Sequence, residues 1–201
     1  MIRYCLLTLL LVISSCEKQK VEPPEECNNY ILTGDKESGC INYIDFEPNI
    51  YITPQSWEGD MSYSFDIQSD GVADFVFNTS SWSSWSGEGR ISEIVPLNSN
   101  SIICSHARED LAAKYEFDTI INYSSNWSND NLIFAYDYKR YYLEGEQEYS
   151  HSIGGEWLSI PDSGYMGLRL IDEFDTIYAW VLMSAGRYDI TIRGYAYLEK
   201  Q

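Results

Sequence analysis

Oxygen-bearing side chains recur along residues 66–75 at a spacing that suits a bound metal ion. Counted from the first aspartate, they fall at positions 1, 3, 5 and 9, and Gly71 stands at position 6. Ca²⁺ takes six to eight oxygen ligands, and a glycine permits the sharp turn that gathers them. The sequence therefore predicts a structural Ca²⁺ site whose ligands include a backbone carbonyl at position 7: Asp66, Gln68, Asp70, Val72 and Asp74.

A second interpretation of the same segment is a tight hairpin without an ion. Gln68 is neutral, and Phe77 stands at position 12, where a calcium loop usually supplies a bidentate glutamate. Aspartates in turns also accept hydrogen bonds from nearby backbone amides. Both interpretations are open from sequence, and an ion held here would bind weakly, with a dissociation constant of about 10⁻⁴–10⁻³ M.

Three tryptophans in polar surroundings form the second candidate site: Trp57, Trp82 and Trp85. Aromatic rings exposed among Ser, Asn and Asp can stack on sugar rings, which predicts glycan binding. The alternative is that these rings fold back under a long loop as a small satellite core. Large aromatic side chains usually find cover, so the sequence favours the alternative.

The chain offers no recognisable catalytic motif. Nucleophile elbows, zinc-binding H-E-x-x-H helices, C-x-x-C pairs and phosphate-binding glycine loops are missing, and the two histidines, His106 and His151, have no neighbouring signature. A glycosidase needs two carboxylates, but 31 acidic residues make any chosen pair arbitrary. The sequence names no catalytic residue.

The formal net charge of −18 at pH 7 restricts the partners. A surface this acidic repels the phosphate backbone, so we expect no nucleic-acid partner. It also repels anionic lipid headgroups, so membrane attachment would need a different device.

The N-terminus supplies such a device. A cationic start is followed by an apolar stretch of ten residues, Tyr4 to Ile13, which is too short for the ~20 residues of a membrane span. Ile13-Ser14-Ser15-Cys16 then resembles the lipobox of bacterial lipoproteins. The resemblance implies cleavage before Cys16, lipidation of its thiol, and a cell-envelope location on the outer membrane, facing the periplasm or the cell surface.

This N-terminus also suggests the domain organisation. Residues 1–15 are expected to form the export signal, and residues 16–26 the lipidated cysteine with a charged, proline-containing tether. Residues 27–201 are expected to form one domain. In an oxidising compartment a disulfide is expected, and Cys27 with Cys40 closes the shorter loop, with Gly34 and Asp35 available to turn the chain. Cys104 lies in an apolar segment and is expected to be a buried free thiol, although its pairing with Cys27 or Cys40 stays open.

Alternation of apolar and polar residues dominates this domain and predicts strands. Many short strands with polar turns between them favour an all-β fold, an antiparallel β-sandwich of jelly-roll type. One short helix is expected over residues 107–115, because Leu111 and Tyr115 lie four apart. Residues 79–89 are polar and rich in Ser and Gly, and are expected to form a loop. The strands are predicted near residues 41–46, 61–67, 75–77, 90–95, 131–138, 165–170, 176–183 and 187–193.

Several short motifs between residues 41 and 197 resemble a family of secreted and anchored bacterial β-sandwich proteins, including Bacteroidota and exosortase-sorted ones. That family carries D-x-x-P-D, then D-x-N-x-D-G-x-x-D-F, then G-F-R-F, Y-G-W and Y-A-Y. The matching segments here are Asp45–Asn49, Asp66–Phe75, Gly167–Leu170, Tyr178–Trp180 and Tyr195–Tyr197, with differences at Asn49, Gln68, Leu168, Leu170 and Ala179. The resemblance implies a non-catalytic extracellular module.

Together these observations predict a lipid-anchored, non-catalytic envelope lipoprotein. Its expected partners are the membrane through the lipid, and an extracellular glycan or an envelope protein, with Ca²⁺ as a structural brace. The alternative function is a jelly-roll enzyme, a glycosidase or lyase, acting on polysaccharide.

Overall fold

The computed structural model describes residues 27, 29–56, 58–105, 108–141, 149–158, 163–172 and 175–198. These residues form an all-β protein, as predicted. The export signal, Cys16, the tether, Trp57 and His106 lie outside the described residues. The strands are β1 (Tyr30–Leu32), β2 (Ile41–Ile52), β3 (Gly59–Phe65), β4 (Phe75–Ser84), β5 (Gly87–Pro96), β6 (Ser101–Ile103), β7 (Ile120–Asn122), β8 (Trp127–Ser128), β9 (Leu132–Tyr141), β10 (Tyr149–Gly154), β11 (Gly164–Asp172), β12 (Asp175–Ala185) and β13 (Ile190–Leu198).

Two antiparallel sheets make the sandwich. A five-stranded sheet has the order β10-β9-β5-β4-β3, and a six-stranded sheet has the order β2-β13-β12-β11-β6-β8. A two-stranded sheet of β1 and β7 covers the other face of the six-stranded sheet. The antiparallel β-sandwich is therefore confirmed.

The main core lies between the two large sheets. Phe65, Phe77 and Phe134 of the five-stranded sheet pack there, with Phe77 and Phe134 stacked at 6.0 Å between ring centroids. Strand β12 is buried on both faces, so that Ile177 and its alternate residues face this core while Trp180 packs under the two-stranded sheet. Burial on both faces explains the nearly continuous apolar run in this strand.

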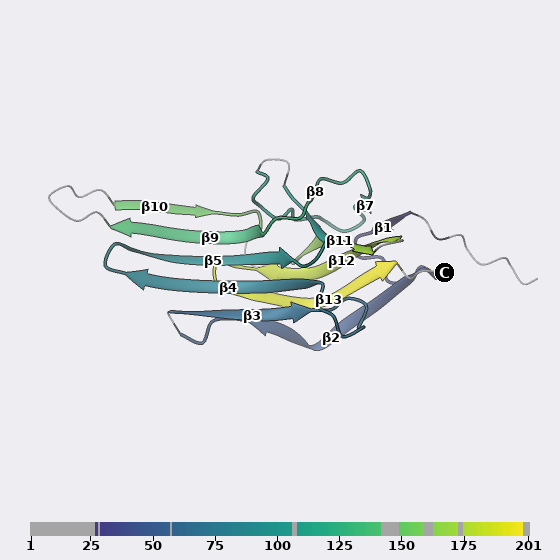
Figure 1. Cartoon of the computed structure of the whole chain (residues 1–201), viewed down its shortest axis with the longest axis horizontal. Coiled ribbons are helices and arrows are strands. Elements are labelled where there is room, and N and C mark those ends of the chain that lie inside the picture. Colours follow the sequence, from purple (N-terminus) through teal and green to yellow (C-terminus); the bar gives the residue numbers. More distant parts are fainter. Residues whose placement is uncertain are drawn as a thin grey trace, which may run out of the picture.

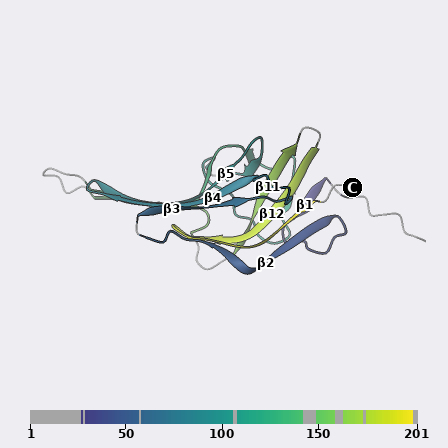
Figure 2. The ribbon, with the colours of Figure 1, turned by 60° about the horizontal axis from the view of Figure 1, so that its bottom comes forward.

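The five-stranded sheet is longer than its partner. The tips of β4, β5, β9 and β10 extend past the ends of β12 and β13 (Figures 1 and 2), so this part of the sheet has no second sheet against it. We call it the overhang, and define it as the strand segments from the paired residues Trp82, Gly89, Tyr138 and Ser152 to the strand tips.

The structure corrects two local predictions. Residues 108–115 form no helix: Leu111 bridges Ile133, and Tyr115 bridges Tyr165. Their spacing of four reflects two separate strand-like contacts. Residues 79–89 are not a loop, because β4 continues to Ser84 and β5 begins at Gly87. The buried positions of this hairpin are Thr79, Ser81, Gly87 and Gly89, so the alternation of burial continues there without the apolar residues that mark a strand in the sequence.

The cysteine prediction is confirmed. Cys27 and Cys40 form a disulfide, and Cys104 is free and buried. Gly34, inside the loop that the disulfide closes, has a φ of +81°, which a glycine adopts without steric cost. Burial raises the pKa of the Cys104 thiol, whose sulfur donates to the carbonyl of Asn126.

Within the residues that the structure describes, no helix is long and apolar enough to cross a bilayer.

Candidate ligand-binding face

The register of the sheet aligns chemically useful side chains on its outer face. Trp82 on β4 pairs with Gly89 on β5, which pairs with Tyr138 on β9, which pairs with Ser152 on β10. Directly paired residues of neighbouring strands point to the same face. The four residues therefore form one row across the sheet, which we call the aromatic row.

A glycine makes this row continuous. The Trp82 ring lies over Gly89, where even a methyl group would collide with its indole atoms. Gly89 therefore lets the ring lean across β5 toward β9. On β9, Tyr138 stacks on Tyr136 with 5.3 Å between ring centroids and 24° between their planes. The result is a shallow strip of aromatic rings that spans several strands.

The tryptophans of the strip are exposed. Trp82 is 46 % exposed, and Trp85, in the turn between β4 and β5, is 78 % exposed. The sequence favoured burial of both rings in a satellite core, and the structure corrects that expectation. Burial fails because these rings lie on the outer face and in the tip turn, over which none of the sheets in the described part of the chain lies.

A groove runs over the aromatic row. Its volume is ≈ 670 Å³, within the range of small-molecule sites. Trp82 and Tyr138 contribute aromatic surface, and Ser150 and Ser152 contribute hydroxyl groups from the edge strand. Arg140 lies two residues beyond Tyr138, and its side chain makes no hydrogen bond or ion pair with any residue of the described ranges. The remaining lining residues are Trp85, Ser86, Lys139 and Tyr141.

The inner face of the same strands carries paired charges. Asp137 is 8 % exposed, and its two carboxylate oxygens contact His151 Nε2 at 2.7 Å and Arg187 Nη1 at 2.9 Å. Burial alone would raise the pKa of Asp137, but the hydrogen bonds from His151 and Arg187 lower it below its usual value. Further toward the tip, Lys139 pairs with Glu88. These contacts assign the inner charges to holding the strands together.

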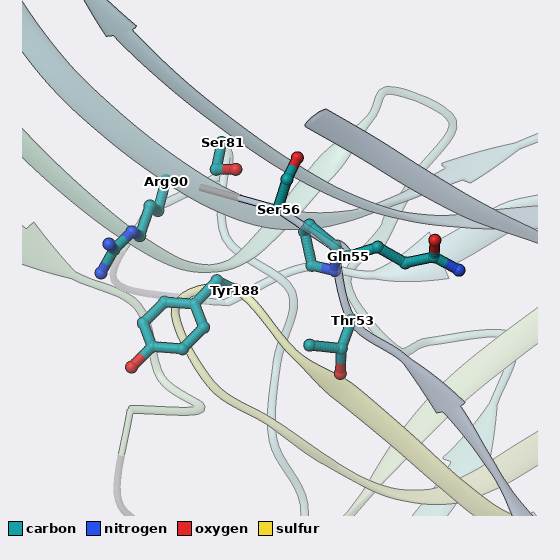
Figure 3. A pocket seen from close by; sticks show the side chains of 7 residues that line it. Thr53, Gln55, Ser56, Ser81, Arg90 and Tyr188 are labelled. Carbon is teal, nitrogen blue, oxygen red and sulfur yellow. The ribbon is translucent and has the colours of Figure 1, made fainter. Parts of the chain in front are cut away.

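A smaller pocket lies beside this inner network (Figure 3). Its volume is ≈ 370 Å³, and it is lined by Thr53, Pro54, Gln55, Ser56, Ser81, Arg90 and Tyr188. The guanidinium of Arg90 lies over the Tyr188 ring, 4.7 Å from its centroid. The cation of this pocket is already engaged by the protein, so we regard the outer groove as the stronger ligand site. Trp57 follows Ser56 in the chain but lies outside the described residues.

The predicted calcium loop connects β3 to β4, and its carboxylates accept hydrogen bonds from the loop backbone. Asp66 accepts from the amides of Asp70 and Gly71, and Asp70 accepts from Val72. Asp74 accepts from the Ile67 amide and the Asn100 side chain. Burial, with the nearby Asp66 and Asp70 charges, raises the pKa of Asp74, although its hydrogen bonds act the other way.

This arrangement matches the hairpin interpretation of the loop. In the part of the chain that the structure describes, no three His, Cys, Asp or Glu side chains are gathered as metal ligands. Gln68 and Val72 are exposed. The carboxylates of Asp66, Asp70 and Asp74 are therefore not gathered as a metal-ligand group in this conformation, and calcium binding stays a prediction.

Sequence reasoning missed Tyr138 and Arg140. They lie more than fifty positions after Trp82 in the chain, and only the β5–β9 register brings them to the same face. Alternation in residues 131–138 predicted the strand, but alternation says nothing about which strand lies beside it. The local indication of a flat surface in the sequence is the pair Gly87 and Gly89, close to Trp82 and Trp85.

Four of the five family-like motifs lie in the six-stranded sheet, on β2, β11, β12 and β13, whereas Asp66–Phe75 joins β3 to β4. Gly167 pairs with Trp180, Trp180 with Ala196, and Ala196 with Tyr43. Trp180 is fully buried and packs against Tyr165 and Tyr43. These motif residues therefore contribute packing, and they lie away from the aromatic row.

Comparison with known proteins leaves the assignment to the geometry: no family model, no curated protein and no solved structure matches this chain.

Proposed function

We propose that this chain is a lipid-anchored, non-catalytic protein of the bacterial cell envelope that binds glycan through its aromatic row. The observation that carries the proposal is the exposure of Trp82 and Trp85 beside Tyr138, on a face that no other described sheet covers. Sugar rings present flat faces of C–H groups that pack on such rings. Ser150, Ser152 and Arg140 offer partners for the sugar hydroxyls.

The lipid anchor rests on the sequence. The apolar segment followed by Ile13-Ser14-Ser15-Cys16 supports lipidation of Cys16 and export to the envelope. Attachment through a lipid would leave the aromatic row, formed by exposed side chains, available to a glycan outside the membrane.

A glycan array with the full-length chain in neutral detergent tests the binding proposal. We expect specific spots, and we expect Trp82→Ala to reduce affinity about 10- to 30-fold, since truncating a central aromatic anchor costs about 1.4–2 kcal/mol. We expect Trp85→Ala to reduce affinity as well. Tyr123→Ala is its matched control, because Tyr123 and Trp85 are both 78 % exposed but lie on different surfaces. A blank array, or equal losses of affinity in Trp85→Ala and Tyr123→Ala, would contradict glycan binding at the aromatic row.

The enzyme alternative can be tested with the same preparation. The groove is lined by aromatic, hydroxyl and cationic side chains, which favours binding as its role. Turnover of any bound polysaccharide that a single Asp or Glu substitution abolishes would replace the non-catalytic proposal with a glycosidase or lyase.

A further inference from the structure

The aromatic row is open at both ends. On one side, β3 begins at Gly59, which pairs with Ser81, so no described strand lies beyond Trp82. On the other side, β10 is the edge strand of the sheet, and Ser150 and Ser152 on it are exposed. Figure 1 shows that β3 begins short of the tips of β4 and β5, and that β10 lies at the opposite edge of the sheet. Within the described ranges, no strand closes the row at either end, so a ligand lying along it could extend past both.

The row is also long enough for more than one sugar. It crosses four strands, and neighbouring strands lie about 4.8 Å apart, so its length is about 14 Å. The Trp82 ring leans over Gly89 toward Tyr138, which keeps the strip flat between β4 and β9. A flat strip fits a ligand that is itself extended.

The charge around the row bears on the ligand's own charge. The chain carries a formal net charge of −18 at pH 7. A polyanion would approach against this field. Arg140 then serves as a hydrogen-bond donor to hydroxyl oxygens, a role that its five N–H groups allow.

We infer that the aromatic row binds an internal segment of a neutral, extended polysaccharide, which enters over Trp82 and leaves over Ser152 or the reverse. This inference rests on the proposed glycan binding and specifies its ligand. The row recognises several consecutive sugar rings, and the ends of the polysaccharide are not needed for binding.

Chain length and chain ends provide the test. The full-length chain is titrated with neutral polysaccharides (mixed-linkage β-glucan, xylan, glucomannan and glycol chitin), with their two- to six-unit oligosaccharides, and with carboxymethyl cellulose and polygalacturonate. We expect one neutral polymer to bind roughly 10-fold or more tighter than its disaccharide. We also expect chemical reduction of the polymer's terminal sugar to leave its affinity unchanged. Arg140→Gln should lower the affinity for the polymer, whereas Tyr123→Ala should not.

The outcomes separate this inference from the proposed function. Equal binding of disaccharide and polymer, loss of binding when the chain end is reduced, or preference for an acidic polysaccharide would overturn the internal, neutral ligand and leave glycan binding standing. If the array and every titrated polysaccharide give no binding, the proposed function fails and the inference fails with it.

Discussion

Neighbouring residues at the end of β9 lie in opposite environments. Asp137 and Lys139 point to the inner face, where Arg187, His151 and Glu88 pair with them. Tyr138 and Arg140 point to the outer face, where both line the groove. The Arg140 side chain makes no hydrogen bond or ion pair with a residue of the described ranges. The same strand therefore uses its inner charges for cohesion and leaves its outer groups available to a ligand. Substitutions on the two faces should separate stability from binding.

The largest expected effect is on the inner face. Asp137→Ala leaves Arg187 and His151 without their shared carboxylate, and we expect it to lower the free energy of unfolding by about 2 kcal/mol. Urea unfolding at pH 7 measures this loss, with the exposed Asp130→Ala as the control. Glycan affinity of the folded variant should stay within about twofold of the parent, a difference of roughly 0.4 kcal/mol.

The pH dependence of this difference identifies its cause. The pKa of Asp137 is lowered in the folded chain, so its contribution is fully present above the unfolded-state value of about 3.9 and is lost as the pH falls through the folded-state pKa. The stability gap between parent and variant should therefore close in acid. A gap of the same size at low and neutral pH would contradict an ionic contribution.

The next effect concerns the outer face. Gly89→Ala places a methyl group in the volume of the Trp82 ring, so the ring must move away from the row. We expect glycan affinity to fall about 10-fold, or about 1.4 kcal/mol, with a smaller change in stability. Gly39→Ala is the control, since a methyl group there meets nothing within 4 Å. Unchanged affinity would mean that the position of Trp82 over β5 does not matter for binding.

The smallest expected effect concerns calcium, which should act on neither face. With a dissociation constant of about 1 mM, the weak end of the expected range, 1 mM Ca²⁺ would stabilise the chain by about 0.4 kcal/mol. Thermal melts with Ca²⁺, Mg²⁺ and chelator, repeated on Asp66→Asn, measure it. A rise that is specific to Ca²⁺ and absent in the variant would support the predicted ligands. An unchanged melt would leave Asp66, Asp70 and Asp74 as turn residues.

The strands and the disulfide could be predicted because their signals are local. Alternation around residues 61–67 and at Ile190 and Ile192 follows from burial of one face, whereas Tyr188 is exposed ahead of β13, and Cys27 and Cys40 are close in sequence. The hairpin at residues 79–89 was missed because its buried positions are Thr79, Ser81, Gly87 and Gly89, which show no apolar alternation. The segment 108–115 was misjudged because Leu111 and Tyr115 serve two distant strands, Ile133 and Tyr165 being their partners.

The candidate site could be predicted only in part. Two of its tryptophans were identified from their polar surroundings, but their exposure depends on the outer face of the sheet, over which no other described strand lies. Tyr138 and Arg140 join them through strand pairing over a long sequence separation, a property that composition and periodicity do not encode. The site is thus a product of topology more than of any motif.

The disulfide between Cys27 and Cys40 also sets how the domain bears mechanical load. Force applied to the chain before Cys27 is transmitted through the disulfide to Cys40 and then directly to β2, which is paired with β13 along most of its length. Strand β1 lies inside the closed loop and carries none of that force. The small sheet of β1 and β7 is thereby protected from this force. The hydrogen bonds between β2 and β13, loaded in shear, then resist mechanical unfolding when the N-terminus is pulled away from a bound ligand.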